Sequence, residues 1–175
     1  MKSEATDNLR RRADDLARLL DRLAGLHEQM LSVIERRLDA IRAADLDATC
    51  ACNDEQEVLA RRIHEREGMR KQLMDAIGVE LGLGAKEGRA LTVSQLVRNL
   101  PDCLGEQLQT ARDRLRGVMG RVAHANRVSG AVSRELASHL RFVFAAVRPA
   151  SGKSGHYSPN GITKNVGAGV FETIG

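Results

Sequence analysis

The sequence predicts an all-α fold: an elongated antiparallel bundle of three long helices with one short connecting helix and a flexible C-terminal tail. Two observations lead to this prediction. The 175 residues include only four aromatic side chains and three prolines, whereas strands of a sandwich or barrel need aromatic and β-branched residues. Apolar residues also recur at three- and four-residue steps over long stretches, which is the helical period. We expect one helical domain at residues 1–150 and a Gly-rich tail at residues 151–175.

The first long helix is expected from about residue 7 to residue 44, with Thr6 or Asp7 as its N-cap. His27 falls within its apolar stripe and is therefore interpreted as a histidine of the core or of a helix interface. The stripe is broad enough to contact more than one neighbouring helix. Its members are Leu9, Ala13, Leu16, Leu20, Leu23, His27, Met30, Ile34 and Ile41, widened by Leu19, Leu26 and Val33.

The second helix is expected from about Leu46 to Leu81, with a weaker apolar pattern and a charged centre. The pattern runs through Leu46, Cys50, Val58, Leu59, Ile63, Met69, Leu73, Met74, Ile77 and Leu81. Four glycines between residues 78 and 88 predict its end, because glycine costs about 1 kcal/mol per helical position relative to alanine. Thr92-x-x-Gln95 is a capping-box pattern, which predicts a short helix from Val93 to Asn99.

The third long helix is expected from Asp102 to Val147, and its three-four alternation is the clearest in the chain. After Pro149 the composition changes to Gly, Ser and Asn, which predicts the flexible tail. The tail ends on an apolar motif, Val170-Phe171-x-x-Ile174, which is a candidate docking peptide. The apolar positions of the helix are Leu104, Leu108, Ala111, Leu115, Val118, Val122, Ala125, Ser129, Val132, Leu136, His139 or Leu140, Val143 and Val147.

Charge and apolar runs exclude several classes of protein. The 27 basic and 23 acidic residues give a net charge of +4, and acids are interspersed with the arginines, as on a solvated helix surface. No apolar segment follows the basic N-terminus, so no secretory signal is expected. The longest apolar runs are too short for a membrane span. Three cysteines, Cys50, Cys52 and Cys103, suggest buried thiols in a reducing cytoplasm rather than a disulfide framework.

No motif for catalysis or for a cofactor is apparent. Gly152-Lys153-Ser154 resembles the end of a phosphate-binding loop, but Val147 stands where that loop needs its first glycine. The Cys50-x-Cys52 spacing does not match a zinc site, and no Ser-His-Asp set has local support. We therefore predict no enzyme activity, no catalytic residue, no metal site and no cofactor.

The three long helices carry more apolar stripe than a thin bundle can bury, which favours recognition of a partner helix. One alternative is a structural subunit that forms homo-oligomers through its third helix. A further alternative is an Arg-rich nucleic-acid binder, although no aromatic platform for base stacking is present before residue 142. Its candidate residues are Arg10-Arg11-Arg12, Arg61-Arg62 and Arg112-x-Arg114-x-Arg116.

Four features of residues 7–162 together resemble one known family. They are the long amphipathic first helix, a charged stretch from Asp54 to Met74 followed by a Gly-rich break, a long last helix with Asn126 near its middle, and Tyr157-Ser158-Pro159-Asn160-Gly161 after that helix. In this combination the chain resembles FlgN, the export chaperone of the bacterial flagellar type III secretion system.

The resemblance implies a cytoplasmic helical chaperone without enzymatic activity. Such a protein binds the amphipathic C-terminal helices of the hook-associated proteins of the hook-filament junction, prevents their premature assembly and delivers them to the export gate. It would need no nucleic acid and no membrane insertion. By carry-over from the family, Tyr157 would contact the export gate. The client-binding residues would be Val132, Leu136, Leu140, Val143 and Val147.

Overall fold

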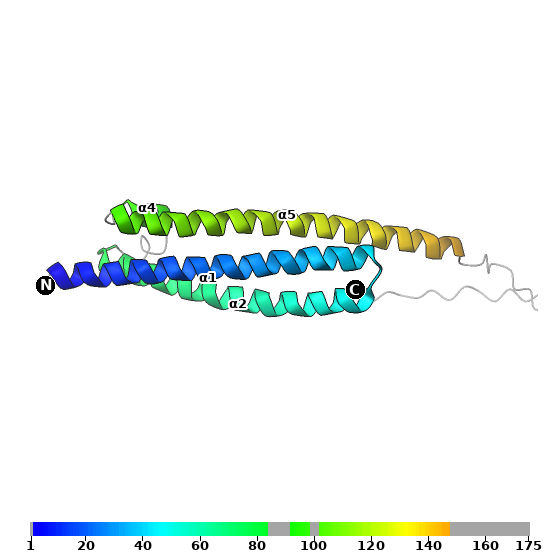
Figure 1. Cartoon of the computed structure of the whole chain (residues 1–175), viewed down its shortest axis with the longest axis horizontal. Helices are drawn as coiled ribbons and strands as arrows, with labels where there is room; N and C mark the ends of the chain where they lie inside the picture. The colour runs from blue at the N-terminus through cyan, green and yellow to red at the C-terminus, as the bar shows by residue number, and fades with distance from the viewer. Residues whose placement is uncertain (1, 84–91, 99–101, 148–175) are drawn as a thin grey trace, which may run out of the picture. The chain divides into compact units, whose positions relative to one another are not determined.

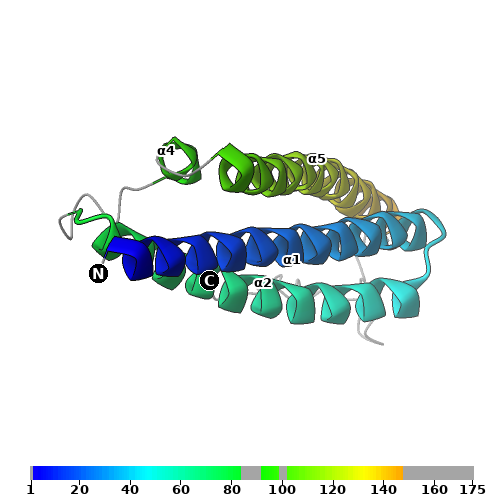
Figure 2. The ribbon, with the colours of Figure 1, turned by 60° about the vertical axis from the view of Figure 1, so that its left-hand side comes forward.

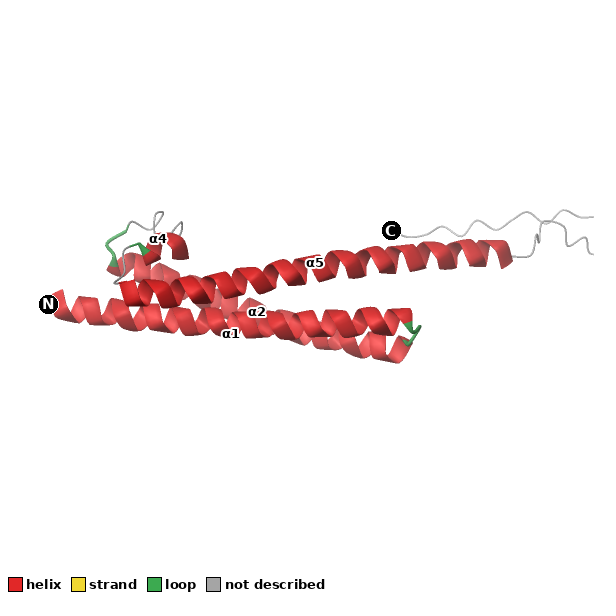
Figure 3. Cartoon of the chain, turned by 45° about the horizontal axis from the view of Figure 1, so that its top comes forward, coloured by secondary structure: helices red, strands yellow, loops and turns green. Residues whose placement is uncertain are grey.

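A computed structural model describes residues 2–83, 92–98 and 102–147, and these residues are helical apart from short turns (Figure 3). The helices are α1 (Lys2–Arg42), α2 (Leu46–Glu80), α4 (Val93–Val97) and α5 (Asp102–Val147). The described ranges contain no strand, and the predicted all-α fold with three long helices and one short one is confirmed.

The helix boundaries agree with the predicted ones to within two residues except at the start of α1. This helix begins at Lys2, so the predicted N-cap at Thr6 or Asp7 is wrong. The residues before Thr6 include Lys, Glu and Ala, which favour helix, so no breaker stops the helix there. Between α1 and α2 the chain turns through Ala44, whose φ is 54°, and the Asp45 side chain then caps α2 by accepting the Ala48 N–H at 2.9 Å.

The chain divides into two compact units, residues 1–133 and residues 134–175, with the boundary inside α5. The described part of the second unit is the end of this helix, up to Val147. The first unit contains α1, α2, α4 and the first part of α5. A single domain at residues 1–150 with a flexible tail after it stays a prediction, and residues 148–175 lie outside the described part of the chain.

Within the first unit, α1 and α2 form an antiparallel hairpin, and α5 runs along α1 in the same direction (Figures 1 and 2). Ion pairs fix the hairpin at both ends, Arg12 with Glu80 and Arg36 with Glu55, each at 2.6 Å. Arg114 of α5 reaches two carboxylates of α1, Asp21 at 3.4 Å and Glu28 at 3.2 Å. Arg37, further along α1, contacts Ser129, further along α5, so the residue numbers of the two helices increase in the same direction.

The main core lies where α4 and the start of α5 meet the α1–α2 hairpin. Leu16, Leu23 and Leu108 are completely buried in it. Full burial of a leucine contributes roughly 1.5–3 kcal/mol relative to an exposed position, so this cluster dominates the stability of the unit. Its buried members are Ala13, Leu16, Leu19, Leu20, Leu23, Ala24, Met74, Ile77, Leu96, Leu104, Leu108, Ala111, Leu115 and Val118. A second, much smaller cluster joins Val33, Cys52 and Leu59 of α1 and α2.

The buried face of α2 differs from the predicted one at its N-terminal end. Leu46 and Cys50 are exposed, whereas Cys52 and Leu59 are buried against α1. Cys52 and Leu59 are seven residues apart and share one helix face, from which Cys50 is rotated by about 160°. The expectation of buried thiols is therefore right for Cys52 and wrong for Cys50.

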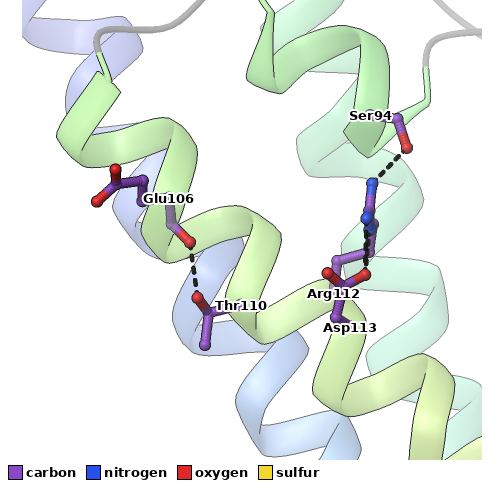
Figure 4. A network of polar contacts seen from close by, with 5 residues as sticks. All are labelled: Ser94, Glu106, Thr110, Arg112 and Asp113. Atoms are coloured by element: carbon purple, nitrogen blue, oxygen red, sulfur yellow. Dashed lines mark hydrogen bonds and ion pairs between the residues drawn. The ribbon is translucent and has the colours of Figure 1, made fainter.

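Polar contacts and one buried leucine hold the short helix α4 against α5. The predicted capping box is confirmed, since the Gln95 N–H donates to Thr92 Oγ1 at 3.2 Å and the Thr92 N–H donates to Gln95 Oε1 at 2.8 Å. Arg112 of α5 donates to Ser94 Oγ at 2.6 Å and pairs with Asp113 (Figure 4). These contacts hold Leu96, which is completely buried, against the beginning of α5.

Candidate functional site

The last part of α5 presents an apolar face that the described helices leave exposed. We call Val132, Leu136, Leu140 and Val143, with Val147, the α5 terminal face. Val132 is partly buried, whereas Leu136, Leu140 and Val143 are 42%, 45% and 39% exposed. The same helix buries Leu104, Leu108, Leu115 and Val118 at equivalent positions of its stripe. The terminal face therefore continues the apolar stripe that forms the core earlier in α5, but its own side chains are exposed.

Phe144 widens this face, whereas Phe142 is exposed on another side of the helix. Phe142 is 73% exposed and Phe144 is 69% exposed. Phe144 follows Leu140 by four residues and lies beside it, whereas Phe142 is displaced from Val143 by about 100° around the helix. Neither residue was in the predicted set, because Phe142 lies off the stripe and the predicted series passes from Leu140 to Val143 rather than to Phe144. Their signal was their type: an aromatic side chain buries a large area and commonly anchors an interface.

Several residues that the sequence singled out either lie outside the described residues or are paired with none of them. The side chain of Val147 lies outside the described residues, as do Tyr157, the phosphate-loop-like segment at residues 152–154 and the apolar motif at residues 170–174. Asn126 of α5 is exposed, and no described residue is paired with it.

A polar contact lies on α5 just before the terminal face. Ser129 is completely buried, although serine is usually exposed. Arg37 of α1 donates through Nη2 to Ser129 Oγ at 2.8 Å and through Nη1 to Asn53 Oδ1 of α2 at 3.2 Å. Arg37 Nε is buried and has no hydrogen-bond partner among the described residues. Sequence analysis had not singled out Arg37, because an arginine on a charged helix carries no distinguishing pattern.

His27 occupies the helix interface that its position in the stripe predicted. The side chain is partly buried, and its Nδ1 has no hydrogen-bond partner among the described residues. Burial lowers the pKa of His27 below its ordinary value, and the negative charge of Glu67 on α2 opposes that shift. The imidazole is therefore held preferentially in its neutral form.

The titratable side chains of the described ranges form no cluster suited to metal binding, since no three His, Cys, Asp or Glu residues gather there. Open grooves run between α1 and α5, past Asp14 and Glu106, and between α1 and α2, past Arg22 and Arg66. Both are surface hollows whose linings mix charged side chains with neutral polar and apolar ones. In the described part of the chain, no helix has the length and apolar character needed to cross a bilayer.

A helical bundle that continues into a helix with an unpaired apolar face is typical of proteins that bind a partner helix. The family comparison agrees with this class. The family model described as FlgN protein matches residues 12–165, which is most of the chain, and the chain belongs to the FlgN family. Neither a curated protein nor a solved structure matches it. Family membership gives the chain the general role of a flagellar export chaperone, a class of cytoplasmic proteins whose clients are hook-associated proteins.

Proposed function

We propose that the chain binds amphipathic C-terminal helices of hook-associated proteins on the α5 terminal face, prevents their premature assembly and delivers them to the export gate. The observation that carries this proposal is the exposure of Leu136, Leu140 and Val143 on a stripe that is buried earlier in the same helix. Exposed apolar side chains in this arrangement match the i, i+4, i+7 anchors of helix recognition.

The affinity expected for such a face suits a client that must later be released. Burial of apolar area contributes about 25 cal/mol per Å², and the exposed Phe144 adds to the area that Leu136 and Leu140 offer. Association and side-chain ordering offset much of this gain. Binding in the micromolar to nanomolar range, about −8 to −12 kcal/mol, is the result we expect.

A charge placed on the terminal face tests the proposal. Leu136→Asp and Val143→Asp should each abolish client capture, because an aspartate facing a client's apolar stripe would be buried without a partner. The helix should persist, since both side chains are exposed in the free chain. Titration calorimetry with purified client helices measures the first effect, and circular dichroism measures the second.

Ser138→Asp is the matched control, because Ser138 is exposed and lies on the opposite side of the same helix. It should bind clients as the wild type does. Undiminished binding by both Leu136→Asp and Val143→Asp would contradict the proposed client surface.

Delivery to the export gate is assigned to the tail, with Tyr157 as the contact residue. Deletion of residues 151–175 should leave client affinity unchanged and weaken binding to the purified cytoplasmic domain of the export gate. Tyr157→Ala should reproduce the second effect alone. Loss of client affinity on deletion would contradict this division between helix and tail.

The terminal face could also be covered by a second copy of the chain, as in the structural alternative. Light scattering on the purified chain separates the two readings. For a chaperone, the molar mass of the complex should equal that of one chain plus one client. A structural subunit should instead form a stable oligomer that added client helices do not dissociate.

A further inference from the structure

Arg37 is a partly buried positive charge with no carboxylate partner. Its guanidinium donates to two neutral acceptors, Ser129 Oγ at 2.8 Å and Asn53 Oδ1 at 3.2 Å, while Nε is buried and unpaired. Among the described residues, no Asp or Glu oxygen lies within ion-pair distance of it. A charge that is partly removed from water is usually paired with an opposite charge, and neutral acceptors supply hydrogen bonds without a countercharge, so this guanidinium is incompletely compensated.

The other arginines that bridge helices of the first unit do have carboxylate partners. Arg36, the immediate neighbour, contacts Glu55 at 2.6 Å, and this hydrogen bond raises the pKa of Arg36. Arg12 contacts Glu80 at the same distance, and Arg114 reaches two acids of α1. Arg37 therefore departs from the rule by which this bundle joins its helices.

The position of Arg37 relates it to the proposed client surface. Its partner Ser129 precedes Val132 by three residues and Leu136 by seven, so all three lie on one side of α5. A helix that covers the stripe at Val132 and extends one turn toward the start of α5 comes to the level of Ser129, where Ser129 itself is completely buried and its partner Arg37 is only partly buried. Polar atoms on that turn of the partner would lie closest to Arg37.

The charge of this part of α5 favours an acidic partner. Residues 116–147 contain five arginines and one glutamate, Glu135. Arg127 and Arg134, on the turns around Ser129, have no ion pair among the described residues. A surplus of positive charge attracts carboxylates and disfavours basic helices during encounter.

We propose that Arg37 receives a carboxylate of the client helix, so that the clients of this chaperone carry an Asp or Glu where their apolar stripe meets Ser129. The planar guanidinium matches a carboxylate through paired N–H donors. The carboxylate would replace or join the neutral acceptors and supply the missing countercharge. This inference rests on the proposed function and gives it a determinant of specificity.

The test uses the full-length chain and synthetic C-terminal helices of the hook-associated proteins from the same genome. Each Asp or Glu of a helix is replaced singly by its amide. Titration calorimetry compares the wild type with Arg37→Gln, Arg37→Lys and the matched control Arg36→Gln, whose arginine already has Glu55. Circular dichroism and thermal unfolding establish that the variants remain folded.

Arg37→Gln should weaken binding about 10- to 100-fold, the range expected for loss of a partly buried charge pair. Arg37→Lys should lose less, and Arg36→Gln should remain within about twofold. One amide-substituted client should bind the wild type and Arg37→Gln equally weakly, since the double-mutant cycle then isolates their pair. The wild-type affinity should also fall more steeply with salt than that of Arg37→Gln.

The outcomes separate this inference from the proposed function. If the wild type binds none of the client helices, the proposed function fails and the assignment of Arg37 fails with it. If the wild type binds and Arg37→Gln binds equally well, only the role of Arg37 is overturned. The role is equally overturned if no client carboxylate couples to Arg37, because a purely structural arginine would lower affinity for all client variants alike.

Discussion

The two halves of α5 carry the same apolar spacing in different surroundings. Leu108 and Leu115 of the first half are buried against α1, α2 and α4, whereas Leu136 and Leu140 of the second half are exposed. The charges differ in the same way: Arg114 contacts Asp21 and Glu28, but Arg134 has no ion pair among the described residues. One helix thus combines a region that stabilises the bundle with a region available to a partner.

This comparison supports the proposal that a client helix completes the core of the exposed half. An apolar stripe kept only for folding would end where the neighbouring helices end. Isolated exposed apolar residues are common on protein surfaces, whereas a contiguous apolar row extended by Phe144 is typical of interaction sites.

The largest difference between the halves should appear on truncating one leucine in each. Leu108→Ala should lower the free energy of unfolding by about 2–5 kcal/mol, because it leaves a cavity in the main core. Leu140→Ala should change it by no more than about 0.5 kcal/mol, as an exposed position does. Urea unfolding followed by circular dichroism measures both.

The client affinities of these variants should show the reverse order. Leu140→Ala should weaken client binding, whereas Leu108→Ala should bind normally at temperatures where it is folded. Equal destabilisation by the two substitutions would mean that the terminal face is already buried in the free chain. The two halves of α5 would then not differ in burial.

A smaller difference is expected for the arginines of the two halves. Arg114→Gln should cost about 0.2–1 kcal/mol, the usual range for exposed ion pairs, and the cost should decrease in high salt. Arg134→Gln should leave stability unchanged, since no described acid is paired with it. Thermal unfolding at low and high salt makes this comparison. A salt-dependent loss in Arg134→Gln would reveal an ion pair in the second half.

The smallest effect concerns the pH dependence of stability in the first unit, where His27 of α1 lies in a helix interface. Because burial lowers the pKa of His27 in the folded chain, the unfolded chain binds a proton more readily. Its contribution to stability is therefore complete above the ordinary imidazole pKa of about 6.5 and declines as the pH falls through that value. The loss of thermal stability from about pH 7.5 to pH 5.5 should be smaller in His27→Gln than in the wild type. An equal loss would assign the pH dependence to other groups.

Much of the secondary structure followed from local sequence signals. The Thr92-x-x-Gln95 box and the full extent of α5 from Asp102 to Val147 were predicted correctly. Each depends on neighbours within a few residues along the chain, through capping hydrogen bonds or the helical period. The start of α1 was missed because a plausible N-cap residue does not end a helix when good helix formers precede it.

Residues whose role depends on contacts between helices were harder to predict. The sequence placed Cys50 rather than Cys52 on the buried face of α2, because the weak apolar pattern there fits more than one helix face. Arg37 was not recognised, since its bond to Ser129 joins residues 92 positions apart. No local pattern records such a contact.

The sequence by itself determined the all-α class, most of the helix ends and a continuous apolar stripe along α5. The tertiary structure decided which part of that stripe is buried. Ser129, which Arg37 of α1 contacts, is the last buried residue in the described part of α5, and Leu136, Leu140 and Val143 after it are exposed. Periodicity specifies which side of a helix can be buried, but burial also requires a neighbouring helix at the same level, and that depends on how the helices pair in space.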